Sequence, residues 1–125
     1  MQDRPTAQEL LKAAREFCEN DLGPALTGRL RFHVRVLQNI LGILEREWEG
    51  EEAAVRAEFA RLQRLLEIGD APEGFRALRE RVRDANAELA KKIRSGELDD
   101  RTGEVLEALR GTVREKLEIA NPNWF

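Results

Sequence analysis

The sequence has few of the side chains that catalytic and metal centres usually need. Its 125 residues include one cysteine, Cys18, one histidine, His33, and no tyrosine. A single cysteine excludes a disulfide framework within the chain. One histidine cannot supply a Cys/His zinc site or the paired Glu-x-x-His motifs of a di-iron bundle. Glycine-rich phosphate loops are missing as well. We therefore predict no catalytic residues, no metal and no cofactor, and favour a protein without enzymatic activity.

Long apolar runs and an excess of one charge are also missing. No window approaches the run of about 20 apolar residues that spans a bilayer, and residues 1–5 do not resemble a signal peptide. The 21 basic and 24 acidic residues give a net charge of -3, which leaves no large positive field for nucleic acid. We expect a cytoplasmic protein that binds neither membranes nor nucleic acid, with one domain over residues 1–125.

Amphipathic helical patterns fill most of the chain, and no segment alternates like a strand. The pattern predicts an all-α, single-domain bundle of about five helices, mostly antiparallel neighbours because the connections are short. A capping box at Thr6–Glu9 begins the first helix. The expected breaks between helices are Asn20–Pro24, Gly50, Gly69–Pro72 and Ser95–Gly96, and Asn121–Pro122 ends the last helix.

The second predicted helix, from about Thr27 or Gly28 to about Glu49, has an unusually wide apolar arc. Two strips at helical spacing make up this arc: Leu30, Val34, Leu37, Leu41, Leu44 and Trp48, and Phe32, Val36, Ile40 and Ile43. A helix that is apolar over more than half of its circumference is usually touched on several sides. We therefore expect this helix to be central, with both strips buried.

The arginine-rich segment 29–36 contains the candidate binding residues. His33 falls near the principal apolar face, so a hydrogen-bonded core histidine is the simpler interpretation. The alternative is a polar pocket in which His33, Arg35 and Asn39 bind a small anion. Arg35 and Asn39 lie one turn apart, which would let them act together.

Three further features have a structural and a functional interpretation. Arg76, Arg79 and Arg83 could bind an anion, although nearby acidic residues favour internal pairing. The acidic run 45–52 suits a solvated corner around a buried Trp48. The terminal Trp124 and Phe125 are expected to fold back on the bundle or to dock on another chain, because large exposed aromatics are unfavourable.

Several segments together resemble a known family. They are Arg4–Ala7 with Glu9–Leu11, Gly28–His33 with Arg35, Val36 and Asn39, Ile93–Asp100, and Leu117–Pro122. They are similar to a small bacterial family of uncharacterised helical proteins, usually encoded beside aminoglycoside-phosphotransferase-like proteins and acyl-CoA dehydrogenases. The resemblance implies no activity and no site residues. It implies an accessory role near a kinase-like enzyme and acyl-CoA metabolism.

Two functions from different classes follow. The first is an interaction protein that binds or regulates a phosphotransferase-like neighbour, with self-association into a homodimer as a variant. The second is a binder of a small anionic ligand, or an enzyme, that uses the pocket around His33, Arg35 and Asn39.

Overall fold

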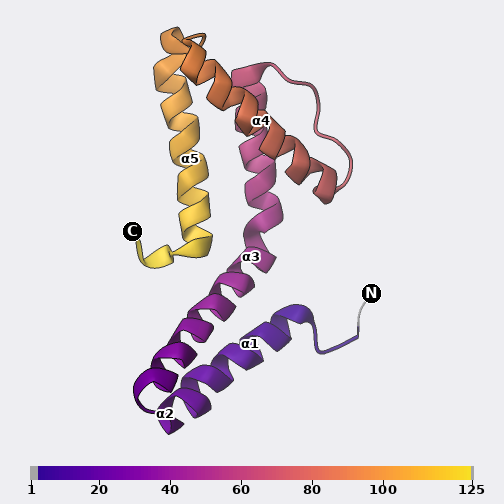
Figure 1. Cartoon of the computed structure of the whole chain (residues 1–125). Coiled ribbons are helices and arrows are strands. Elements are labelled where there is room, and N and C mark those ends of the chain that lie inside the picture. Colours follow the sequence, from indigo (N-terminus) through magenta and orange to yellow (C-terminus); the bar gives the residue numbers. More distant parts are fainter. Residues whose placement is uncertain (1–2, 125) are drawn as a thin grey trace. The chain divides into compact units, whose positions relative to one another are not determined.

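The computed structural model describes residues 3–124, and the regular elements of these residues are all helices, as predicted (Figure 1). The elements are α1 (Ala7–Phe17), a π-helical turn η1 (Cys18–Leu22), α2 (Gly23–Ala25), α3 (Gly28–Leu66), α4 (Phe75–Ser95), η2 (Asp99–Arg101), α5 (Thr102–Ala120) and η3 (Pro122–Trp124). They form two compact units, one of residues up to 50 with 119–123, and one of residues 51–118 with 124. The prediction of one domain over residues 1–125 stays a prediction.

In the first unit, α1 packs antiparallel to the first half of α3. Thr6 accepts a hydrogen bond from the Glu9 amide at 3.2 Å, so the predicted cap is confirmed. Arg15 donates to the Glu45 carboxylate across the two helices, and this hydrogen bond raises the pKa of the guanidinium. Gly42 is buried, and a Cβ there would lie 3.8 Å from the Arg15 side chain of α1, at ordinary contact distance.

The first helix does not stop at Asn20–Pro24, so that predicted break is wrong. The chain continues through the π-helical turn, in which the Gly23 amide donates to the Cys18 carbonyl oxygen. Pro24 lies at the start of α2, where its missing N–H leaves no hydrogen bond unmade. A Cβ on Gly23 would lie 2.9 Å from that carbonyl oxygen, so the turn depends on glycine. Cys18 is buried, as expected of a small hydrophobic residue.

The predicted break at Gly50 is also wrong, because α3 continues without interruption to Leu66. A glycine within a helix costs only about 1 kcal/mol relative to alanine. The neighbouring residues Glu47–Val55 are mostly good helix formers, so this cost is readily offset. The second and third predicted helices are therefore one helix.

In the second unit, the second half of α3 packs with α4 and α5 around an apolar core. Its buried members are Phe59, Leu62, Leu65, Leu66, Leu78, Val82, Ala85, Leu89, Leu98 and Val105. Asn86 donates to Glu58 at 2.8 Å, and Lys116 lies 3.6 Å from the same carboxylate. Gly96, in the left-handed conformation with φ 84°, ends α4 at its predicted boundary. Within the described residues, no helix is long and apolar enough to cross a membrane.

The prediction that both apolar strips of the first half of α3 are buried is wrong for most of their residues. Val34 is 9% exposed, but Leu37 is 43%, Phe32 62% and Trp48 66% exposed. The physical reason is the path of α1, which covers the side of α3 that carries Val34, Gly42 and Glu45. We call the exposed residues of α3 the α3 apolar face: Leu30, Phe32, Val36, Leu37, Ile40, Leu44 and Trp48.

Candidate functional site

The predicted binding residues His33, Arg35 and Asn39 are all exposed on α3. The interpretation of His33 as a core histidine is therefore wrong. Arg29 donates a hydrogen bond to His33 Nε2 at 3.2 Å, and the ring of Phe32 meets the imidazole edge-on at 5.8 Å between centroids. At 3.6 residues per turn, Arg35 and Asn39 share a side of α3 and His33 points elsewhere. Their predicted binding of an anion stays a prediction.

The other charged candidates are mostly paired within the second unit. Arg79 lies 3.3 Å from Glu51 and stacks over the Phe75 ring at 5.9 Å, while Arg76 lies 3.9 Å from Glu80. These contacts agree with the interpretation of internal pairing. Trp48 does not form a buried corner, because two thirds of it is exposed.

The terminal aromatic residues were expected to fold back or to dock on another chain. Trp124 is 70% exposed, so folding back is wrong for this residue. Phe125 lies outside the described residues. A contact of Trp124 or Phe125 with another chain stays a prediction.

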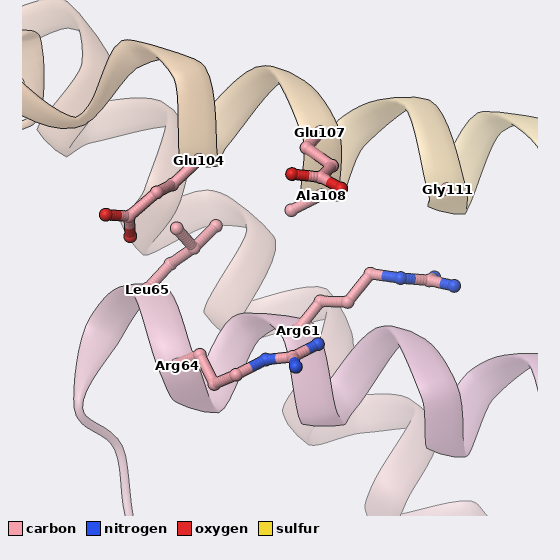
Figure 2. Close-up of a pocket in the computed structure, with 7 residues that line it drawn as sticks. All are labelled: Arg61, Arg64, Leu65, Glu104, Glu107, Ala108 and Gly111. Atoms are coloured by element: carbon pink, nitrogen blue, oxygen red, sulfur yellow. The ribbon is translucent and has the colours of Figure 1, made fainter.

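A groove in the second unit, which sequence reasoning missed, runs between α3 and α5 (Figure 2). Its volume is about 440 Å³, and it is lined by Arg61, Arg64, Leu65, Glu104, Glu107, Ala108 and Gly111. The guanidinium of Arg61 donates to both carboxylate oxygens of Glu115, at 2.7 and 2.8 Å. This hydrogen bonding raises the pKa of Arg61 above its usual value. Gly111 makes room for the guanidinium, since a Cβ there would lie 2.9 Å from Arg61 Nε.

The side chains at the groove therefore mainly hold α3 and α5 together. Arg101 adds to these contacts, because it donates to the carbonyl oxygens of Arg64 and Leu65 on α3 and to the carboxylate of Glu104 on α5. The hydrogen bond to Glu104 raises the pKa of Arg101. Figure 2 shows the side chains of Arg64 and Glu107 at the groove, and among residues 3–124 neither has an ion-pair partner.

A second surface lies on α5. Val105 is buried, but Leu106, Leu109 and Val113 are exposed and Leu117 is half-buried. These four residues, the α5 apolar strip, line a shallow groove of about 560 Å³ together with Arg110 and Arg114. Sequence periodicity showed that α5 is amphipathic, but not how much of its apolar arc the rest of the unit covers.

Titratable side chains do not gather into a metal centre in the part of the chain that the structure describes. No group of three or more histidine, cysteine, aspartate or glutamate residues there could hold a metal ion. Two apolar surfaces are exposed instead, the α3 apolar face and the α5 apolar strip. Exposed apolar helix faces of this kind are suited to packing against other helices.

Comparison with known proteins gives the chain a family but no activity. Residues 24–124 match the model of a family described as a domain of unknown function, DUF6285. The chain therefore belongs to this family. No curated protein and no solved structure matches it.

Proposed function

We propose that the protein is an interaction module that binds a phosphotransferase-like protein through the α5 apolar strip. The observation that carries this proposal is the exposure of Leu106, Leu109 and Val113 along one side of α5. Spacings of three and four residues give a continuous stripe of the kind that packs into an apolar groove or against another amphipathic helix.

The flanking charges favour a partner of a particular kind. Arg110 and Arg114 border the groove beside the strip, and Arg114 also lies 3.5 Å from Glu118. Guanidinium groups beside an apolar stripe suit a partner helix that carries carboxylates next to its own apolar residues. Such charges contribute to specificity and to the rate of association more than to affinity.

The identity of the partner comes from the resemblance described above. The similar bacterial proteins are usually encoded beside aminoglycoside-phosphotransferase-like proteins and acyl-CoA dehydrogenases, and genes that stay together often encode proteins that act together. A phosphotransferase-like protein encoded beside this one is therefore the partner to test first. The role would be to bind or regulate that enzyme.

Co-purification of the two coexpressed proteins tests the proposal. We expect a stable complex, which Val113→Glu should weaken at least tenfold because it places a charge in the apolar contact. Ile93→Glu, at an exposed apolar position on α4, is the matched control and should leave binding unchanged. Two proteins that never associate, or a complex that tolerates Val113→Glu, would refute the proposal.

The second predicted function, binding of a small anion by His33, Arg35 and Asn39, can be tested separately. A ligand that binds the folded protein raises its melting temperature by mass action. If Arg35 and Asn39, which share a side of α3, bind an anion, a screen with acyl-CoA, nucleotide and sugar-phosphate ligands finds a stabilising compound, and Arg35→Ala removes the effect without unfolding the protein. Absence of any stabilising ligand would leave the interaction role as the better proposal.

A further inference from the structure

The α3 apolar face is large for a surface that stays in contact with water. Its seven residues are between 39% and 66% exposed. With about 200 Å² for a fully exposed large apolar residue, they present roughly 700 Å². The largest apolar patch on a typical monomer is about 300–600 Å². Two such faces together would cover about 1,400 Å², within the range of roughly 1,200–2,000 Å² for stable interfaces.

The charges along this half of α3 are divided between its two ends. Arg29, Arg31 and Arg35 lie in the first eight residues, whereas Glu45, Glu47 and Glu49 lie in the last six residues before Gly50. Arg46 is the one basic residue at the acidic end, and it donates to the Ile119 carbonyl oxygen at 2.8 Å. Glu45 is paired with Arg15 of α1, so the negative charge of this end comes from Glu47 and Glu49. The helix is therefore positive at one end of the apolar face and negative at the other.

Two copies of this helix have complementary charges only when they run antiparallel. Two parallel copies would place like charges side by side, which destabilises a helix pair. Two antiparallel copies would place the basic end of each helix beside the acidic end of the other. An antiparallel pair around a two-fold axis uses the same surface on both copies and closes without leaving a free face.

Helical geometry places one residue of each sign on the apolar face itself. Arg29 and Glu47 are 18 residues apart, which is about five turns, so both point to the same side of α3 as Ile40. In an antiparallel pair centred between Leu37 and Ile40, Arg29 of one copy lies opposite Glu47 of the other. The same register brings Leu30 near Trp48 and Phe32 near Leu44. His33, which accepts a hydrogen bond from Arg29 and is not counted among these charges, points between Ile40 and Leu44 on the same side.

We propose that the α3 apolar face binds a second copy of this chain, as an antiparallel pair around a two-fold axis with Arg29 of each copy beside Glu47 of the other. This contact uses residues of the first unit, whereas the α5 apolar strip lies in the second. The pair therefore does not depend on the proposed phosphotransferase-like partner, and each can fail without the other.

Reversing the charges of Arg29 and Glu47 tests whether the dimer forms and whether its two α3 helices run antiparallel. We expect sedimentation of the full chain at micromolar concentration to give a dimer. Arg29→Glu alone and Glu47→Arg alone should each weaken it about tenfold or more, because each creates two repulsive contacts. The double variant Arg29→Glu/Glu47→Arg should restore the dissociation constant to within about threefold, since it exchanges the two charges.

Matched controls lie on the opposite side of the same helix. Arg31 and Glu49 are exposed, differ from the test pair by two positions and are likewise 18 residues apart. Arg31→Glu and Glu49→Arg change the total charge equally but point away from the face, so both should leave the dissociation constant within about threefold of its original value. Leu37→Glu, near the centre of the face, should give a folded monomer.

Several results would overturn the proposal. They are a monomer at every concentration up to about 100 µM, single reversals that leave association unchanged, because a parallel pair keeps like charges facing each other at both positions, and a double variant that is weaker than either single variant. If Leu37→Glu lowers the melting temperature of a chain that is already monomeric, the face is covered within one chain. A dimer that persists with Leu37→Glu but is lost with Val113→Glu would assign self-association to the α5 apolar strip.

Discussion

Replacing Gly111 by alanine tests how Arg61 joins α3 to α5. In a helix interior, alanine is more favourable than glycine by about 1 kcal/mol. At Gly111, however, the new Cβ would lie 2.9 to 3.1 Å from three atoms of the Arg61 guanidinium. That group is held by two hydrogen bonds to Glu115, and the two side chains are only 20% and 28% exposed. The guanidinium therefore cannot move away without weakening the pair.

The expected magnitude follows from these two opposing effects. Hydrogen bonds to charged groups contribute about 1.5–3 kcal/mol, and a displaced pair should lose part of this. We expect Gly111→Ala to lower the free energy of unfolding by about 0–1 kcal/mol, although alanine is the better helix former. In an Arg61→Met background the obstacle is gone, and the same substitution should raise the free energy of unfolding by about 1 kcal/mol.

Denaturant unfolding followed by helical circular dichroism measures the four proteins of this double-mutant cycle. Gly103→Ala is the control, because a Cβ at Gly103 in the first turn of α5 meets nothing within 4 Å. The reasoning predicts a coupling of about 1–2 kcal/mol between positions 61 and 111. If Gly111→Ala stabilises the original protein by the full helix-propensity difference, Arg61 is not held as described and the reasoning is refuted.

Three further substitutions test other parts of the structure. Leu78→Ala should lower the free energy of unfolding by about 2–5 kcal/mol, because Leu78 is only 1% exposed. Ile93→Ala on the same helix should cost much less, and similar losses for the two would contradict the assigned core. Glu58→Ala should cost about 1–3 kcal/mol, because it leaves Asn86 without its acceptor, and an unchanged denaturation midpoint would count against this buried pair. Gly23→Ala should destabilise the first unit by about 1–3 kcal/mol, because the new Cβ clashes with the Cys18 carbonyl oxygen. The new Cβ of Gly69→Ala meets nothing within 4 Å and should not destabilise the protein in this way; equal effects of the two would show that the π-helical turn can relax.

Local sequence signals predicted those boundaries that depend on one or two residues. Thr6 caps α1, Gly96 ends α4 in the left-handed conformation, and Pro122 follows the end of α5. Core residues of the second unit such as Phe59 and Leu62 on α3, or Leu78, Val82 and Ala85 on α4, recur at spacings of three and four residues, which is the pattern of a buried helix face. These features could be predicted because each follows from nearby residues alone.

Features that depend on distant parts of the chain could not be predicted in this way. Gly50 looks like a break, yet α3 continues through it without interruption. The turn at Pro24 survives because the π-helical hydrogen bond of Gly23 precedes it. Amphipathicity showed that the first half of α3 is apolar, but not which arc α1 covers; the buried Gly42 and the Arg15–Glu45 pair decide this.

Trp48 lies on the α3 apolar face, so its fluorescence reports directly on whether this face is buried against another copy of the chain, as we propose. Trp124 is the second of the two tryptophans, so Trp124→Phe leaves Trp48 as the single fluorophore. We expect the emission of Trp48 to shift to shorter wavelength as the protein concentration rises from nanomolar to micromolar, and Leu37→Glu to abolish the shift. Emission typical of a water-exposed indole at every concentration would show that the α3 apolar face stays in water.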